Sequence, residues 1–260
     1  MRKLLVAFSV TLFVVGLPWQ ASAGAATRPP LARRVGPVTS LRVQPAASTS
    51  TNWSGYAALE GSAPFTKVSG KWTQPAVDCS KTPSGYSSFW VGLDGYTSNS
   101  VEQDGSEADC SGGTASYDVW WEMYPLYEVP VFSIHAGDVI VAKVAYDGGS
   151  FKLTVKDKTS GRGFTRTSAC EAASCQRSSA EWIAEAPSAG GVLPLSDFGT
   201  VNFEASKAGI ASHSGTITDG HWTNDEITMV SKSDRSKVKA QPGPLNGAGT
   251  AFSVAWMAST

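Results

Sequence analysis

Two short segments of the chain place an amide and a carboxyl side chain among aromatic and apolar residues. Residues 100–105 carry Gln103, and residues 180–185 carry Glu185 close to Trp182. Apolar surroundings raise the pKa of a carboxyl group toward the range in which it acts as a base, and an amide can donate a hydrogen bond to a developing oxyanion. Gln103 and Glu185 are therefore the predicted catalytic pair, able to hydrolyse a peptide bond without a Ser or Cys nucleophile and without a metal ion.

The sequence contains few of the local motifs that mark other kinds of catalytic site. The chain has three histidines, His135, His213 and His221, and neither a GxSxG elbow nor an HExxH helix accompanies them. Spacing does not exclude a Ser-His-Asp triad, since triads assemble in space, but no local pattern favours one. A phosphate-binding glycine loop and a dinucleotide fingerprint are both absent from the sequence. We therefore expect neither a cofactor nor a metal ion.

Alternation along two expected strands assigns further side chains to common faces. One strand presents Trp120 and Glu122 on the same face, and another presents Trp90 and Asp94. Such faces suit the binding of an extended polymer, either peptide or polysaccharide. In the alternative interpretations a strand Trp is simply a core residue, Glu122 is a buried structural acid, and Asp94 shapes a turn. The opposite faces, expected in the core, carry Val119, Trp121, Met123, Phe89, Val91 and Leu93.

The sequence pattern of the chain is typical of an all-β protein. Runs rich in Val, Thr, Trp, Tyr and Phe alternate with Gly, Ser, Asp and Asn clusters, as in residues 139–146, 147–149 and 151–156. Turn signals recur at hairpin spacing, which favours an antiparallel sandwich over a parallel α/β sheet. Residues 51–260 are enough for a single domain with a sizeable core.

The first residues are expected to direct export. Arg2 and Lys3 precede an apolar run that is followed by a small-residue pattern at residues 21–23, so residues 1–23 are predicted to be a secretory signal peptide. Residues 24–50 are rich in Ala, Pro, Thr and Ser and predict a pro-segment or flexible leader. No later apolar stretch is long enough to span a bilayer. We therefore expect an extracellular protein that does not associate with membranes after signal cleavage.

Charge argues against a nucleic-acid partner. The first 50 residues hold six basic residues and no acidic one, so their loss shifts the formal net charge from −1 to −7. Phosphate binding needs clustered Lys and Arg, which the remaining sequence lacks. The basic leader suggests regulation, in which it lies across an acidic cleft at neutral pH and is released when the cleft carboxylates are protonated.

The four cysteines predict up to two disulfides in an oxidising compartment. They are Cys79, Cys110, Cys170 and Cys175. The sequence does not determine their connectivity, although Cys79 with Cys110 and Cys170 with Cys175 is the most local choice. Zinc binding is the competing interpretation, but the paired CxxC spacing is missing.

Five short motifs occur along the chain: NWSGY at residues 52–56, WVGLDG at 90–95, VEQ at 101–103, WEMYP at 121–125 and AEWIAE at 180–185. They stand in the order seen in the glutamic peptidases, or eqolisins, and the chain resembles that family from about residue 52 to the C-terminal strands. The signal-peptide style and the cysteine positions suggest a bacterial-type member.

The resemblance implies a β-sandwich of two curved antiparallel sheets, of concanavalin-like or jelly-roll type, whose concave face forms the substrate cleft. It implies a monomeric acid endopeptidase that acts on proteins and peptides through a Gln and Glu dyad. The dyad falls on Gln103 and Glu185, while Trp90, Asp94, Trp120 and Glu122 fall on positions that line or support the cleft. An acid that follows the catalytic Gln in fungal members has either Glu107 or Asp109 as its counterpart.

Two alternatives from other classes stay open on the residues alone. A jelly-roll glycoside hydrolase would use two carboxyl groups, Glu122 and Glu185, whose separation would mark retaining or inverting chemistry. A noncatalytic lectin-like module would use the same aromatic face only to bind.

Overall fold

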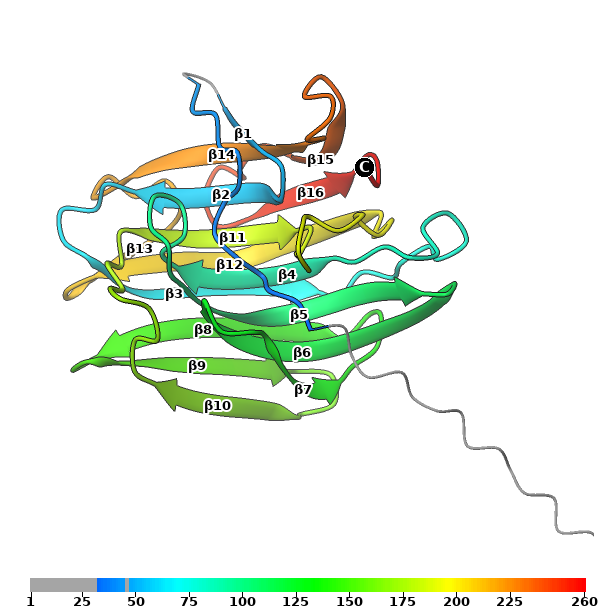
Figure 1. Ribbon diagram of the computed structural model, residues 1–260. Coiled ribbons are helices and arrows are strands. Elements are labelled where there is room, and N and C mark those ends of the chain that lie inside the picture. Colours follow the sequence, from blue (N-terminus) through cyan, green and yellow to red (C-terminus); the bar gives the residue numbers. More distant parts are fainter. Residues whose placement is uncertain (1–31, 45–46) are drawn as a thin grey trace, which may run out of the picture. The chain divides into compact units, whose positions relative to one another are not determined.

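The computed structural model describes residues 32–44 and 47–260, in which every regular element is a β-strand (Figure 1). The predicted signal peptide lies outside the described residues. Within the described ranges there is no helix long and apolar enough to cross a membrane. The strands are β1 Ser48–Ser50, β2 Trp53–Leu59, β3 Phe65–Thr73, β4 Ser88–Leu93, β5 Val101–Ser111, β6 Thr114–Tyr124, β7 Val129–Ser133, β8 Val139–Asp147, β9 Ser150–Asp157, β10 Gly163–Ser168, β11 Ser179–Glu185, β12 Thr200–Ile210, β13 His213–Gly215, β14 Thr223–Val230, β15 Val238–Pro242 and β16 Phe252–Trp256.

The strands form one hydrogen-bonded path that folds over into two layers (Figure 1). One layer has the order β2-β11-β4-β5-β6-β7, the other has the order β10-β9-β8-β3-β12-β16, and β14 and β15 connect them. Strands that are not neighbours in the path pack face to face, as β3 does on β4 and β5 does on β8. Pairing is antiparallel along the path, and β1 adds to β14 in parallel. The predicted all-β sandwich is confirmed.

Large aromatic side chains fill the space between the two layers. Trp72 of β3 and Trp182 of β11 are fully buried there. Their indole nitrogens donate hydrogen bonds across the interior, from Trp72 to Ser106 Oγ at 2.9 Å and from Trp182 to the Ser69 carbonyl at 2.8 Å. Burying an aromatic ring with its N–H satisfied combines apolar stabilisation with a fixed orientation. The predicted core faces are confirmed, because this core contains Val119, Met123, Phe89, Val91 and Leu93, with Trp121 packed against it.

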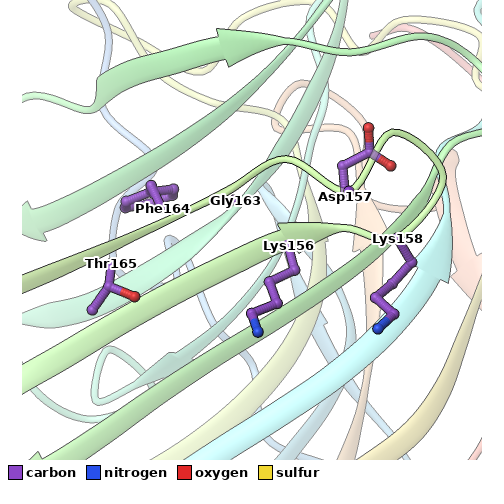
Figure 2. Close-up of a pocket in the computed structure, with 7 residues that line it drawn as sticks. Lys156, Asp157, Lys158, Gly163, Phe164 and Thr165 are labelled. Carbon is purple, nitrogen blue, oxygen red and sulfur yellow. The ribbon is translucent and has the colours of Figure 1, made fainter.

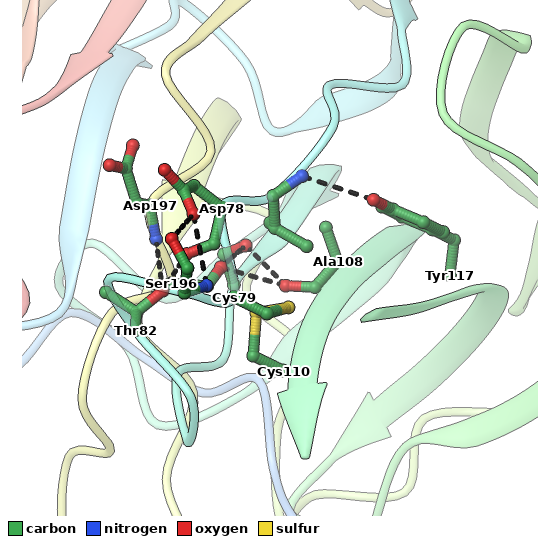
Figure 3. Close-up of a disulfide and its surroundings, with 11 residues drawn as sticks. Asp78, Cys79, Thr82, Ala108, Cys110, Tyr117, Ser196 and Asp197 are labelled. Carbon is green, nitrogen blue, oxygen red and sulfur yellow. Dashed lines mark hydrogen bonds between the residues drawn. A yellow bond between two sulfur atoms is a disulfide. The ribbon is translucent and has the colours of Figure 1, made fainter. Parts of the chain in front are cut away.

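Two disulfides join the cysteines in the most local pairing, Cys79 with Cys110 and Cys170 with Cys175. Cys79 lies in the loop after β3, and Cys110 lies near the end of β5. Figure 3 shows hydrogen bonds around this link, including those from Ser196 Oγ to the Ala108 carbonyl at 2.9 Å and from the Asp197 amide to Thr82 Oγ1 at 2.9 Å. The link therefore anchors the loop against the end of β5.

Removal of the Cys79–Cys110 disulfide is expected to lower stability more than removal of the other disulfide. The two cysteines are 31 residues apart, whereas Cys170 and Cys175 are 5 apart, and a longer loop restricts the unfolded chain more. We expect the double Ser variant at 79 and 110 to lose about 2–4 kcal/mol of unfolding free energy in urea titrations. The matched double Ser variant at 170 and 175 is the control, and an equal loss in both would contradict this account.

Candidate active site

A second apolar cluster lies apart from the interlayer core and contains the aromatic residues predicted to face the cleft. Trp90 of β4 and Trp120 of β6 are fully buried in it, together with Trp53 and Ile183. The Trp53 and Trp90 rings meet edge to face, with centroids 5.0 Å apart. Alternation thus sends Trp90 and Trp120 to the face opposite Phe89, Val91 and Val119, as the sequence predicts.

Gln103 and Glu185 come from β5 and β11, which both pair with β4 in the same layer. Gln103 lies opposite Gly92 of β4, and Glu185 lies opposite Ser88 of the same strand. Both side chains are buried. Segments about 80 residues apart in the sequence are therefore brought to one face by ordinary strand pairing.

The Glu185 carboxyl group accepts hydrogen bonds from three directions. Asn52 Nδ2 and the Gly36 amide reach Oε1 at 3.1 Å each, and Trp90 Nε1 reaches Oε2 at 3.2 Å. Burial raises the pKa of Glu185 well above its ordinary value, and these hydrogen bonds oppose the rise because they stabilise the ionised form. A carboxyl group held in this way is suited to taking up and releasing a proton.

The side-chain amide of Gln103 contacts Val35, the residue that precedes Gly36 in the chain. Its Nε2 donates a hydrogen bond to the Val35 carbonyl and lies 3.5 Å from Glu122 Oε2. The same Glu122 oxygen accepts a hydrogen bond from the Val35 amide at 2.9 Å. Burial raises the pKa of Glu122, and the nearby Glu128 and Glu185 add to the rise. Gln103 and Glu185 thus converge on the peptide unit that joins Val35 and Gly36, while Glu122 binds the amide of the preceding unit.

Asp94 lies in a different set of contacts. It is fully buried, and its carboxylate accepts hydrogen bonds from the Arg177 amide at 2.6 Å, the Ser178 amide at 2.8 Å and Ser100 Oγ at 3.2 Å. Its φ of 70° lies in the left-handed region, which Asp tolerates in turns. These contacts fit the alternative in which Asp94 shapes a turn. The placement of Asp94 in the cleft stays a prediction.

Sequence reasoning missed the residues of the N-terminal segment that meet the dyad. Arg33, Val35 and Gly36 are buried, although they belong to the stretch for which a pro-segment or flexible leader is expected. Arg33 forms ion pairs with Glu107, Asp109 and Glu128. The adjacent Arg33 and Arg34 in a stretch without acidic residues were the available signal, and the contacts of Arg33 match the expectation that a basic leader lies across an acidic cleft. Release of the segment by acid stays a prediction.

The three histidines pair with aspartates elsewhere in the described chain. His213 Nε2 and His221 Nδ1 lie 3.0 Å and 2.8 Å from the Asp219 carboxylate, and His135 Nδ1 lies 3.6 Å from Asp138. The described contacts therefore give no Ser–His pair of the kind a triad needs.

An open hollow lies at the β9–β10 hairpin and holds none of the predicted site residues. Figure 2 shows Lys156, Lys158, Phe164 and Thr165 around it. Beside Gln103 and Glu185, by contrast, residues of the chain's own N-terminal segment contact both side chains.

Comparisons with known proteins identify the family of the chain. Residues 51–241 match the model of the family described as "Peptidase A4 family". The chain is 33% identical to aspergillopepsin-2 of Aspergillus niger over 217 residues, which are 72% of this chain and 76% of that protein.

Solved structures of similar proteins share the fold. Scytalido-glutamic peptidase with a transition-state analog inhibitor superposes with a TM-score of 0.68 at 21% identity, covering 80% of this chain and 98% of that one. Aspergilloglutamic peptidase from Aspergillus niger superposes with a TM-score of 0.57 at 29% identity, covering 66% of this chain and 99% of that one. The chain therefore belongs to the Peptidase A4 family, the glutamic peptidases that the sequence motifs indicated, and it is a hydrolase of peptide bonds.

Proposed function

We propose that the protein is a secreted acid endopeptidase in which Glu185 is the general base and acid and Gln103 stabilises the oxyanion. The observation that carries this proposal is the position of one peptide unit between the two side chains. Its carbonyl oxygen faces the Gln103 amide, and its nitrogen lies 3.1 Å from Glu185 Oε1. These are the two atoms on which charge and a proton must be placed when a peptide bond is hydrolysed.

The reaction proceeds by direct attack of water. Glu185 in its ionised form, which the hydrogen bonds from Asn52 and Trp90 favour against the effect of burial, takes a proton from a water molecule, whose oxygen forms a bond to the scissile carbonyl carbon. Gln103 Nε2 donates to the resulting oxyanion, and protonated Glu185 then gives its proton to the leaving nitrogen as the carbon–nitrogen bond breaks. Asn52 and Trp90 hold the Glu185 carboxylate in place by their hydrogen bonds. No acyl-enzyme forms.

Glu122, Trp90 and Trp120 serve substrate binding in this proposal. Glu122 accepts a hydrogen bond from the amide of Val35, the residue whose carbonyl faces Gln103. The two tryptophans belong to the apolar cluster around Val35. Family membership argues against both alternatives: the glycoside hydrolase, in which Glu122 and Glu185 would be the catalytic carboxyl groups, and the lectin-like module, which would only bind. Secretion is supported by the predicted signal peptide and by two disulfides, which persist in oxidising compartments.

Digestion of denatured casein at pH 3 to 6 tests the proposal, with a chelator and a pepstatin-type inhibitor present. We expect the wild-type chain to cleave under these conditions. Gln103→Ala should lower kcat about 10²–10³-fold, because it removes one oxyanion donor. Gln176→Ala, at an exposed position, is the matched control and should cleave as wild type does. Full activity of folded Gln103→Ala would remove Gln103 from the mechanism, and loss of all cleavage on addition of chelator would contradict a reaction without metal.

A further inference from the structure

Two histidines and an aspartate meet in a part of the chain that the proposed reaction does not use. His213 is the first residue of β13, and Asp219 and His221 lie in the loop between β13 and β14. His213 Nε2 lies 3.0 Å from Asp219 Oδ2, and His221 Nδ1 lies 2.8 Å from Asp219 Oδ1. The two imidazole rings are stacked with their centroids 3.7 Å apart, and each presents a nitrogen to the same carboxyl group.

The spacing of these atoms is that of ligands around a single metal ion. The two nitrogens and a carboxylate oxygen all lie within 4.8 Å of one another. Around an ion with bonds of about 2.0–2.1 Å, neighbouring ligand atoms are about 2.8–3.4 Å apart, from square-planar to tetrahedral geometry. The two nitrogen–oxygen distances, 3.0 Å and 2.8 Å, fall within this range. Modest rotation of the side chains would therefore bring all three atoms around one ion.

The backbone around the three side chains is held in place by several contacts. β13 pairs with β12, and the buried Trp222 donates a hydrogen bond from its indole nitrogen to the Thr216 carbonyl at 3.1 Å. The His221 amide donates to Asp219 Oδ1 at 3.0 Å and so helps to orient the carboxyl group. A loop fixed in this way loses little conformational freedom when an ion binds.

Gly215 leaves the space that the Asp219 carboxyl group occupies. A Cβ atom at position 215 would overlap that carboxyl group. Glycine permits such a close approach because it has no side chain. The local sequence thus allows the carboxyl group of Asp219 to lie beside both imidazole rings.

The kinds of ligand decide which ions such a site takes. Imidazole nitrogens suit Zn²⁺, Cu²⁺ and Ni²⁺, whereas Mg²⁺ and Ca²⁺ prefer oxygen ligands. Three protein ligands leave a further coordination position to water. His213 and Asp219 are partly exposed and His221 is exposed, so an ion can reach them from solvent. We propose that His213, Asp219 and His221 bind one divalent transition-metal ion of the zinc type, which clamps β13 to the loop before β14.

The site lies at the other end of β2 from the proposed catalytic pair. Leu59, the last residue of β2, pairs with Thr223, two residues after His221, whereas Trp53, the first residue of β2, pairs with Glu185. The strand between these two ends spans about 20 Å. The ion therefore stabilises the fold and takes no part in the proposed reaction. The expectation that the chain binds no metal came from local motifs, whereas these ligands come together in the fold.

Calorimetric titration with ZnCl₂ tests the site. The untagged full-length chain is freed of metal by a chelator and dialysed at pH 7.5, because a histidine ligand must be deprotonated to bind. We expect one ion per chain and a Tm raised by about 5–10 °C at a zinc concentration of about 100 times Kd. His221→Gln should weaken binding at least about 10-fold, since even the loss of an outer-shell partner costs that much. Mg²⁺ titrated alone should give no binding.

His135→Gln is the matched control. His135 lies 3.6 Å from Asp138 but belongs to no group of three such ligands among the described residues, so this variant should bind zinc as wild type does. If Asp219 only accepts a hydrogen bond from each ring, folded wild type will bind no zinc, and the site is overturned. Equal zinc binding by wild type and folded His221→Gln would overturn it too. Casein cleavage by His221→Gln at pH 4 should match wild type, so the site and the proposed function can fail separately.

Discussion

Glu185→Gln should abolish turnover of denatured casein, with kcat lowered about 10⁴-fold, while the protein stays folded. Gln has nearly the shape of Glu, and its one carbonyl oxygen can still accept the hydrogen bonds that Asn52 Nδ2 and the Gly36 amide give to Glu185 Oε1, while the bond from Trp90 is lost. It cannot take a proton from water or give one to the leaving nitrogen, and each of these transfers contributes about 10²–10⁴-fold. The measurement is initial-rate proteolysis at pH 4, together with circular dichroism of the purified variant.

Glu181→Gln is the matched control for this experiment. Glu181 lies on the same strand as Glu185 and is equally buried, but its carboxyl oxygens have no hydrogen-bond partner among the described residues. We expect it to retain wild-type turnover. If folded Glu185→Gln retained ordinary activity, the base would have to be sought elsewhere, and Glu122 would be the next residue to replace.

Stability should be highest near pH 4 and fall steadily as the pH rises toward 8. Burial raises the pKa of Glu102 to about 9, with a further contribution from Asp94, and it raises the pKa of Asp104 and Glu181 well above their ordinary values. The folded state therefore binds more protons than the unfolded state from about pH 4.5 upward. By linkage, the stability these groups give is complete below that pH and is lost as the pH rises toward their folded pKa values.

Groups with the opposite shift act at the edges of this range. The pKa of Asp219 is lowered to about 2, chiefly by hydrogen bonds from His221, so the stability it contributes is lost only as the pH falls below about 4. Burial lowers the pKa of Lys239 to about 8, so the penalty for burying its charge is constant below that pH and is relieved only above it. The interval from pH 4 to 8 is thus governed by the buried carboxyl groups.

Thermal unfolding followed from pH 4 to 8 checks this expectation, with Glu181→Gln as the comparison. Gln mimics the protonated acid, so the variant should match wild type at pH 4 and exceed its Tm at pH 8 by about 5–10 °C, as expected for a change of a few kcal/mol in a domain of this size. A wild-type Tm that rises from pH 4 to 8 would contradict the argument.

Strand faces were predictable because the side-chain period of a strand is fixed by its pleat. Once residues 119–124 and 89–94 are taken as strands, Val119 and Phe89 must point away from Trp120 and Trp90, and the two clusters of the structure follow this division. The order of the motifs likewise predicted that Gln103 and Glu185 act together as a catalytic pair. Their convergence on one peptide unit supports the proposed roles.

Contacts that depend on three-dimensional neighbours were not predictable. The partners of Arg33 lie at residues 107, 109 and 128, and no local pattern connects these positions with a segment 74 or more residues away. Asp94 illustrates the same limit. Its alternation with Trp90 placed it on a common face, but no local pattern indicated that the backbone amides of Arg177 and Ser178 donate to its carboxylate.

Only β4 separates the strands that carry Gln103 and Glu185. Neighbouring strands keep a nearly constant spacing of about 4.8 Å. The distance between Gln103 and Glu185 is therefore set by backbone hydrogen bonding within one layer and not by the packing distance between the two layers. Exchanges of similar volume at Phe203 or Val254, on the opposite layer, should cost modest stability and leave catalytic rates unaltered. Engineering for heat resistance can therefore be concentrated on that layer, which carries neither Gln103 nor Glu185.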